Sequence, residues 1–233
     1  MIRRVNSQRI DLSNFDAAIV DLDGTMVDTL GDFDTALNAT LRELGRPAVA
    51  RADIERMVGK GSMHLIRSAL QHGGLDAAAA QARLDEAWAS YQRHYASANG
   101  AHSEVYSGVA EGLRALRERG LALACVTNKP LAFARELLQA KGLAPFFSQV
   151  FGGDSFARSK PDPLPLIETC KALGSEPSHT LMVGDSQNDA LAARAAGCPV
   201  ALVTYGYNHG EPVRGVDADA YIDRLDELPA RLQ

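Results

Sequence analysis

The sequence predicts an α/β fold, in which a doubly wound parallel sheet forms the core and a small helical domain is inserted into it. Four short runs are uniformly apolar, like strands buried on both faces of a parallel sheet: residues 17–22, 121–127, 180–185 and 199–205. Amphipathic segments alternate with such runs from about residue 105 onward, as crossover helices do. Between the first two runs, residues 29–99 show only helical patterns and are too long for an ordinary crossover. We therefore predict a discontinuous core, residues 1–28 and 100–233, with 29–99 as the inserted domain.

Three helical patterns fill the inserted domain. They are DFDTALNATLRELG, RADIERMVGKGSMHLIRSALQHGG and DAAAAQARLDEAWASYQRHYASA, and the second is broken around its central glycines. In the third, Trp88, Tyr91 and Tyr95 recur at helical spacing, which predicts packing inside this domain.

Four further helices are predicted in the core, and each pattern stops at a glycine, the usual C-terminal stop signal. Those glycines are Gly120, Gly142, Gly174 and Gly197. The apolar residues keep the 3.6-residue period, for example Val109, Leu113 and Leu116 before Gly120.

Composition and charge exclude several classes of protein. With 46% hydrophobic and 23% charged residues the 233-residue chain is globular, and a net charge of -5 argues against a nucleic-acid partner. No run of about 20 apolar residues predicts a membrane span, and MIRRVNSQRIDLSNF lacks the apolar block of a secretory signal. Cys125, Cys170 and Cys198 stand far apart among apolar neighbours, which favours plain packing in a reducing compartment. We expect a cytoplasmic monomer or small homo-oligomer without nucleic-acid or membrane partners.

Polar side chains gather where the predicted strands end. In an open parallel sheet, ligands bind beyond the carboxyl ends of the strands, where loops and helix N-termini meet. The residues at those ends are Asp21, Asp23, Thr25, Thr127, Asn128, Lys129, Asp185 and, four residues later, Asp189. Lys160 precedes a helix expected to begin near Pro161 and Pro163. The sequence thus predicts one crevice containing acids, a hydroxyl, an amide and a lysine.

This set of side chains suits phosphoryl transfer. Asp21 and Asp23 stand at i and i+2 of an extended chain, so their side chains point to one side, roughly 6–7 Å apart. Clustered carboxylates are stabilised by a hard cation such as Mg²⁺, which also binds phosphate oxygens. Thr127 and Lys160 can hold phosphate oxygens, which points to an aspartyl-phosphate. A DxD pair alone is also typical of a turn or helix cap, but four elements in order favour the catalytic interpretation.

The four elements follow one another as DLDGT at 21–25, Thr127 after an apolar strand, Lys160 before Pro161-Asp162-Pro163, and GDSQND at 184–189. In this order they resemble the motifs of the haloacid dehalogenase superfamily of phosphohydrolases, and the match spans nearly the whole chain. The resemblance implies a Rossmann-like core with a helical cap between the first and second motifs. Hydrophobic periodicity predicts the same division independently.

The resemblance also implies roles for the acids. Asp21 would be the nucleophile that attacks phosphorus, and Asp23 the general acid that protonates the leaving oxygen and then activates water. The Asp21 carboxylate, the Asp23 backbone carbonyl and Asp185 would hold Mg²⁺, with Asp189 in support.

Basic and polar residues would bind the substrate. Thr127, Asn128 and Lys160 would contact phosphate, and the lysine would also steady the nucleophile and so counts among the catalytic residues. The cap should supply a cation for a further acidic group of the substrate, and Lys60 is taken as the substrate-binding residue there. The other candidates are Arg56 and Arg67. We interpret His64 as a helix residue without a catalytic role.

Within the superfamily, the chain is similar to the bacterial phosphoglycolate phosphatase family. The likeness is strongest in DLDGTMVDT, VGKGSMHLIRSAL and the run from Gly184 to Pro212. The TYGYNHGEP piece of that run is the most branch-specific, although phosphoryl chemistry does not require it. The resemblance implies hydrolysis of 2-phosphoglycolate, a small phosphate ester, to glycolate and phosphate.

Other functions stay open at this point. A phosphatase acting on a sugar phosphate, a nucleotide or pyrophosphate would use the same motifs. A phosphomutase on this fold would return the phosphoryl group to substrate and exclude water from the intermediate. A non-catalytic phosphate-binding protein would have little need for Asp21, Asp23 and the metal acid together.

Overall fold

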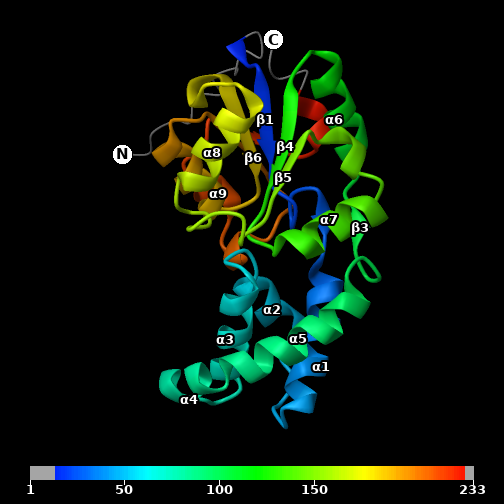
Figure 1. Cartoon of the computed structure of the whole chain (residues 1–233), viewed down its shortest axis with the longest axis vertical. Coiled ribbons are helices and arrows are strands. Elements are labelled where there is room, and N and C mark those ends of the chain that lie inside the picture. Colours follow the sequence, from blue (N-terminus) through cyan, green and yellow to red (C-terminus); the bar gives the residue numbers. More distant parts are fainter. Residues whose placement is uncertain (1–13, 229–233) are drawn as a thin grey trace.

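The computed structural model describes residues 14–228, so the outermost parts of the predicted core, 1–13 and 229–233, lie outside the described residues. A six-stranded sheet forms the centre of the core, with every neighbouring pair parallel (Figure 1). Its spatial order is β5 (Gln149–Phe151), β4 (Ala122–Val126), β1 (Ala17–Val20), β6 (Thr180–Gly184), β7 (Val200–Val203) and β8 (Ala220–Ile222). This order confirms the predicted doubly wound α/β class.

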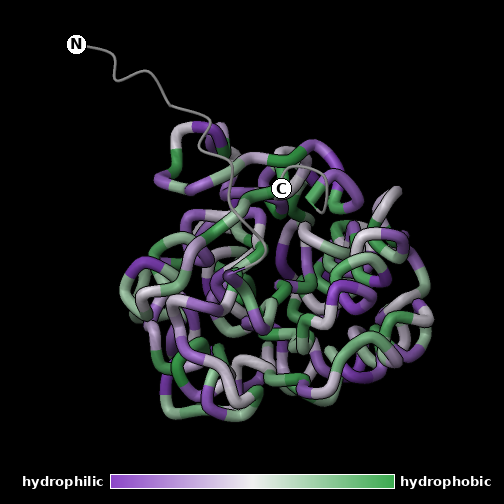
Figure 2. The backbone as a smooth tube through the Cα atoms, turned by 90° about the horizontal axis from the view of Figure 1, so that it is seen from above, coloured by the Kyte–Doolittle hydropathy of each residue, from purple (hydrophilic) through white to green (hydrophobic). Residues whose placement is uncertain are grey.

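Helices cover both faces of the sheet, which explains why the central strands are almost entirely apolar. Ala18 and Val20 of β1 pack with α6 (Val109–Glu118) and α7 (Leu131–Ala140), whereas Ile19 packs with α8 (Leu164–Leu173) and α9 (Gln187–Ala196). Successive residues of a strand point to opposite faces, so a strand covered twice needs apolar residues at every position. Seen from above, hydrophobic segments occur in the middle of the molecule, and hydrophilic stretches mark many outer turns (Figure 2).

Two strands of the sheet could not be predicted from the sequence, because neither forms a recognisable apolar run. β5 and β8 lie at the edges, have three residues each and are only partly buried. Edge strands need fewer apolar residues, so their pattern is short and weak. A further ribbon, β2 (Val27–Asp28) paired antiparallel with β3 (Glu104–Val105), lies where the chain enters and leaves the helical block.

The helical block has its own hydrophobic core and lies below the carboxyl ends of the sheet strands in Figure 1. It consists of α1 (Leu30–Glu43), α2 (Arg51–Met57), α3 (Ser62–His72), α4 (Ala77–Ala82) and α5 (Leu84–Ala98). The break between α2 and α3 falls at Gly59 and Gly61, which have φ of 102° and 88°, values that favour glycine. The third predicted pattern is split at Arg83 into α4 and α5. We propose residues 29–99 as the extent of this cap.

The two chain segments that join cap and core are tied together. The buried Asp32 carboxylate accepts hydrogen bonds from the amides of Gly100 (2.8 Å) and His102 (2.7 Å). Because Asp32 lies in the first turn of α1 and its partners follow α5, the two ends of the cap meet at one place.

Two expectations from composition can be compared with the structure. All three cysteines are buried and free, as plain packing requires. No helix within residues 14–228 is both long enough and apolar enough to cross a membrane.

Candidate active site

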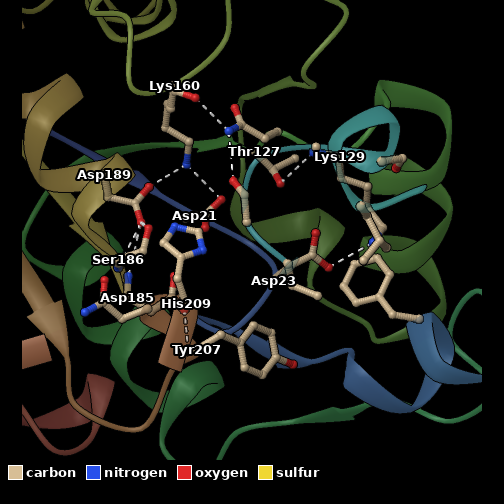
Figure 3. Close-up of a pocket in the computed structure, with 18 residues that line it drawn as sticks. Asp21, Asp23, Thr127, Lys129, Lys160, Asp185, Ser186, Asp189, Tyr207 and His209 are labelled. Carbon is tan, nitrogen blue, oxygen red and sulfur yellow. Dashed lines mark hydrogen bonds and ion pairs between the residues drawn. The ribbon is translucent and has the colours of Figure 1, made fainter. Parts of the chain in front are cut away.

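A pocket that is open to solvent lies between the carboxyl ends of the central strands and the cap (Figure 3). Seven residues that the sequence predicts as functional line it: Asp21, Asp23, Thr127, Asn128, Lys160, Asp185 and Asp189. Phe33 of α1, Ser62 and Leu65 of α3, and the loop around Gly59 close the pocket from the cap side. Parallel strands therefore gather the predicted side chains in one place, as their positions at strand ends require.

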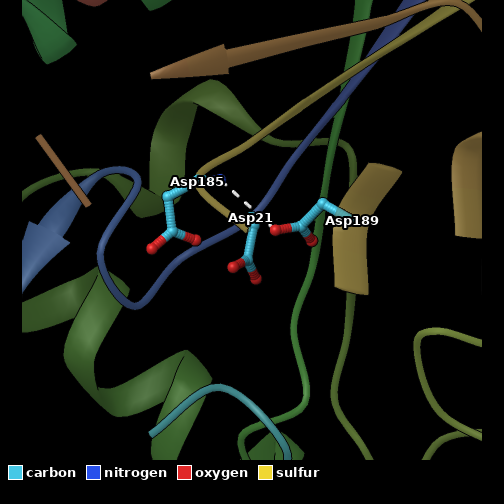
Figure 4. A group of neighbouring side chains, drawn as sticks. All are labelled: Asp21, Asp185 and Asp189. Carbon is cyan, nitrogen blue, oxygen red and sulfur yellow. Dashed lines mark hydrogen bonds between the residues drawn. The ribbon is translucent and has the colours of Figure 1, made fainter. Parts of the chain in front are cut away.

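Three carboxylates form the centre of the site (Figure 4). Asp21 follows β1, Asp185 follows β6, and Asp189 lies in the first turn of α9. One oxygen from each lies within 4.8 Å of the others, and all three residues are buried. Because β1 and β6 are hydrogen-bonded neighbours, their last residues meet at the same level.

Lys160 compensates two of these acids. Its Nζ lies 2.9 Å from Asp21 Oδ1 and 2.7 Å from Asp189 Oδ1, and it donates to the Val126 carbonyl at 2.8 Å. Burial by itself would lower the pKa of Lys160, but Asp189 and Asp21 outweigh it and raise the pKa. The lysine therefore stays charged and holds the nucleophile candidate in place.

Together, the three acids carry more negative charge than one lysine can balance. Burial, the largest cause, raises the pKa of Asp21 to about 7, and burial together with Asp189 and Asp21 raises that of Asp185. Acids that resist ionisation in this way are the donors a divalent cation stabilises. The oxygen donors and their spacing fit a hard cation such as Mg²⁺.

Asp189 has a supporting place in this arrangement. Its Oδ2 accepts from the Ser186 hydroxyl at 2.8 Å and from the Ser186 amide at 3.2 Å, as part of the capping box that starts α9. Its Oδ1 accepts from Lys160. With both oxygens engaged, Asp189 orients the loop after β6, and its supporting part in metal binding stays a prediction.

Asp185 is oriented by two loops. Its Oδ2 accepts from the Tyr207 amide at 2.8 Å, and the Thr25 hydroxyl donates to its Oδ1 at 3.3 Å. Gly24 has φ of 82°, and a Cβ there would lie 2.3 Å from Asp185 Oδ2. Glycine is therefore required behind the two aspartates both by backbone conformation and by the approach of Asp185.

The branch-specific TYGYNHGEP loop connects this site with the cap. Besides holding Asp185, Tyr207 accepts through its hydroxyl from the Thr29 and Leu30 amides (2.7 and 3.1 Å) and donates to Asp28 Oδ1 at 2.8 Å. Tyr207 thus links Asp185 of the acidic cluster to the first residues of the cap, a role that sequence reasoning did not assign.

His209, from the same loop, lines the pocket (Figure 3). Its ring lies 3.4 Å from the Asn188 side chain and approaches Gly59 of the cap. Burial first, and then the charge of Lys60, lower the pKa of His209, so it is neutral at pH 7. The sequence contained this residue in a singled-out loop, but only the fold brings it to the pocket.

Asn128 and Thr127 differ in which of their polar side-chain atoms remain available to a ligand. The Asn128 amide nitrogen donates to the Lys160 carbonyl at 2.8 Å and to the Gly59 carbonyl at 3.0 Å, so it ties the lysine loop to the cap. Thr127 is buried, and its hydroxyl oxygen accepts from the Lys129 amide at 3.2 Å. The hydroxyl hydrogen of Thr127 stays available to a phosphate oxygen.

Lys129 is a pocket residue that the sequence interpretation left without a role. Its Nζ lies 2.9 Å from Asp23 Oδ1, and its side chain is only 1% exposed (Figure 3). Its position in the sequence could have indicated a role, since Lys129 follows Thr127 and Asn128 at the end of β4.

The predicted cap cations lie elsewhere. Lys60 is exposed and is not among the pocket-lining residues, although Gly59 and Gly61 on either side of it are. Arg56 is exposed and pairs with Asp53 at 3.2 Å, and Arg67 does not line the pocket either. Burial, followed by the charges of Lys60 and Arg67, lowers the pKa of His64. These cations affect the potential near the pocket without touching its wall.

Comparison with known proteins decides the family. A family model described as haloacid dehalogenase-like hydrolase matches residues 15–197. The chain belongs to the haloacid dehalogenase-like hydrolase family. Membership of this hydrolase family accounts for the order of motifs and for the acidic centre described above.

Individual relatives of this haloacid dehalogenase-like hydrolase share one name. The phosphoglycolate phosphatase of Thiobacillus denitrificans is 43% identical over 91% of this chain and 92% of its own length. That of Nitrosospira multiformis is 43% identical over 93% of this chain and 95% of its own. A crystal structure of a predicted phosphoglycolate phosphatase from Haemophilus somnus has a TM-score of 0.84 and 32% identity, and the match covers 94% of this chain and 99% of that chain.

Proposed function

We propose that this enzyme hydrolyses 2-phosphoglycolate to glycolate and phosphate, with Mg²⁺, through an aspartyl-phosphate formed on Asp21. The observation that carries the reaction type is the environment of Asp21, a buried carboxylate 2.9 Å from the Lys160 ammonium and beside Asp185 at the floor of an open pocket. The substrate is proposed because several relatives with that activity in their name align over most of the chain.

The first step forms the bond between Asp21 and phosphorus. Lys160 holds the carboxylate and neutralises part of the charge as the phosphate approaches. The bond from phosphorus to the leaving oxygen breaks, and Asp23 transfers its proton to that oxygen, which departs as the hydroxyl of glycolate. Thr127 donates to a phosphate oxygen from the end of β4.

The second step frees phosphate. Asp23, now a carboxylate, takes a proton from a water molecule, whose oxygen attacks phosphorus and breaks the bond to Asp21. Asp21 returns to its starting state. Mg²⁺ would be held by the Asp21 carboxylate, the Asp23 backbone carbonyl and Asp185, where it supplies positive charge for the transferring phosphoryl group.

The site offers a physical reason to favour a hydrolase over a protein that only binds phosphate. A binding protein gains from cations, whereas this pocket holds four carboxylates against two lysines. Burying so many acids costs free energy unless they take part in chemistry or bind a metal. We also propose a cytoplasmic location and a monomer or small homo-oligomer, in keeping with three free, buried cysteines.

A substrate panel tests the proposal. Phosphate release is measured for 2-phosphoglycolate and about a dozen other esters, including sugar phosphates, nucleotides and pyrophosphate, with Mg²⁺ and with a chelator. We expect the highest kcat/KM for 2-phosphoglycolate and loss of turnover on chelation. A higher kcat/KM for another ester would overturn the substrate assignment, and isomerisation of a sugar phosphate without phosphate release would indicate a phosphomutase.

A single substitution tests the nucleophile. Asp21→Asn should abolish turnover while the protein keeps its circular dichroism spectrum, because the amide is a poor nucleophile of nearly the same size. Asp85→Asn, an exposed acid in the first turn of α5, serves as the matched control and should keep wild-type activity. A folded Asp21→Asn enzyme with wild-type turnover would exclude the assignment.

A further inference from the structure

Lys129 is a buried cation that the proposed chemistry does not use. Its side chain is 1% exposed, and its ion-pair partner within residues 14–228 is Asp23, whose side chain is 10% exposed. An ammonium withdrawn from water in this way needs a partner of defined geometry, because desolvation is expensive. The pair therefore occupies one arrangement rather than many.

Two aromatic rings of the cap hold the other side of the ammonium. Lys129 Nζ lies 4.6 Å from the ring centroid of Phe33 in α1 and 4.8 Å from that of Tyr95 in α5. The faces of aromatic rings attract a cation without accepting a proton from it. Lys129 thus comes from the core, pairs with a core carboxylate, and is covered by two helices of the cap.

This arrangement distinguishes the two oxygens of Asp23. Oδ1 accepts the hydrogen bond from Lys129 at 2.9 Å, whereas no hydrogen bond to Oδ2 is found in the described part of the chain. A carboxyl oxygen that accepts from an ammonium is a poor place for a proton, so a protonated Asp23 carries it on Oδ2. Asp23 also lines the pocket, where the leaving group of a substrate must lie.

We propose that Lys129 is a positioning residue for the general acid: it binds Asp23 Oδ1 so that Oδ2 presents its proton to the leaving oxygen. The inference rests on the proposed role of Asp23. In the step concerned, the bond between phosphorus and the leaving oxygen breaks as the bond to Asp21 forms. The proton moves from Asp23 Oδ2 to that oxygen. Phe33 and Tyr95 make the position of Lys129, and hence of Asp23, depend on a seated cap.

Leaving groups of different basicity reveal such a role. Departure of an alkoxide requires a proton, whereas p-nitrophenolate departs without much help, and kcat/KM reports the steps up to this departure. For Lys129→Met we expect kcat/KM to fall about 100-fold on an alkyl phosphate but less than about 10-fold on p-nitrophenyl phosphate. Lys171→Met, an exposed lysine on α8, is the control and should change neither value. An equal loss on both esters would show a merely structural role and overturn the proposal.

A double-mutant cycle tests whether Lys129 acts through Asp23. On the alkyl phosphate, Lys129→Met should cost less than about threefold in an Asp23→Asn background, because the group it positions is already gone. Independent losses that multiply would contradict the proposal. If wild type prefers an alkyl ester other than 2-phosphoglycolate, the same ratios are measured with that ester, so a wrong substrate assignment is recognised separately.

Substitutions at the two cap rings test the proposal without removing either member of the buried ion pair. Phe33→Leu removes one aromatic face and should lower the ratio of alkyl to p-nitrophenyl kcat/KM by about threefold or more. Tyr95→Phe keeps its ring and deletes a hydroxyl for which no hydrogen-bond partner is found within residues 14–228, so it should preserve the ratio. An unchanged ratio in Phe33→Leu would contradict the part assigned to the cap.

Discussion

The Tyr207 hydroxyl is the point at which the core loop and the start of the cap meet, so its removal is the most direct test of that connection. It accepts hydrogen bonds from the Thr29 and Leu30 amides and donates to Asp28. Tyr207→Phe deletes this oxygen while the ring and the backbone amide that binds Asp185 stay. The substitution therefore affects the link to the cap and leaves the acidic cluster unchanged.

The size of the effect follows from which partners lose their bonds. In the variant, the Leu30 amide can still donate to Asp28 Oδ1 at 3.1 Å. For the buried Thr29 amide, however, no second acceptor is found among residues 14–228. A buried donor without a partner costs about 1–3 kcal/mol. We expect the free energy of unfolding to fall by about 2 kcal/mol. At 2–4 °C per kcal/mol for a chain of this length, Tm should fall by about 4–8 °C.

Tyr205→Phe is the matched control, because Tyr205 lies two residues earlier and its hydroxyl donates to the Thr25 carbonyl at 2.8 Å without contacting the cap. Thermal melts should show a smaller loss for it, about 1 kcal/mol or less. Hydrogen exchange followed by mass spectrometry should show faster exchange at residues 27–33 in Tyr207→Phe only. Equal melting temperatures and equal exchange in the two variants would refute the reasoning.

Three further predictions concern the acidic centre. In metal-free protein, burial raises the pKa of Asp21 from 3.8 to about 7, so between these pH values the folded state holds a proton that the unfolded chain releases. Stability should therefore fall as pH rises through this window, and Asp21 should contribute at most about 4 kcal/mol to this loss. Asp21→Asn should flatten the pH dependence of the urea midpoint. An equally steep profile in the variant would contradict this explanation. Lys160→Met should abolish phosphate release and lower the unfolding free energy at pH 7 by about 3–5 kcal/mol, because buried carboxylates lose their counter-ion. Calorimetric melts should show a smaller loss near pH 5, where the raised pKa of Asp21 keeps that carboxyl protonated, and a pH-independent loss would argue against the ion-pair explanation. Gly24→Ala should abolish activity, since its Cβ would lie 2.3 Å from Asp185 Oδ2. The control is Gly45→Ala, because Gly45 has φ of 67° but open space around it. This variant should stay active, and its free energy of unfolding should fall by only about 1–2 kcal/mol through backbone strain. Equal activity of the two glycine variants would show that Asp185 does not depend on this close approach.

Much of the fold could be predicted because burial on two faces leaves a local signal. The central strands β1, β4, β6 and β7 are apolar at nearly every position, and their helices repeat at 3.6 residues. The edge strands β5 and β8 could not be predicted from hydrophobic patterns, because partial burial over three residues imposes no distinctive pattern. The split of the last cap helix at Arg83 likewise has no glycine or proline to mark it.

The sequence by itself predicted the side chains that are proposed to react, because the chemistry needs particular residue types and the parallel sheet places strand ends together. Asp21, Asp23, Thr127, Lys160 and Asp185 could be named from the end of a strand or the start of a helix. Only the tertiary structure decided what surrounds them. Local sequence did not reveal that Lys129 pairs with Asp23, that a loop beyond β7 supports Asp185, or that Lys60 lies outside the pocket wall. Those contacts join segments far apart in the chain, and their geometry depends on how the cap packs against the core.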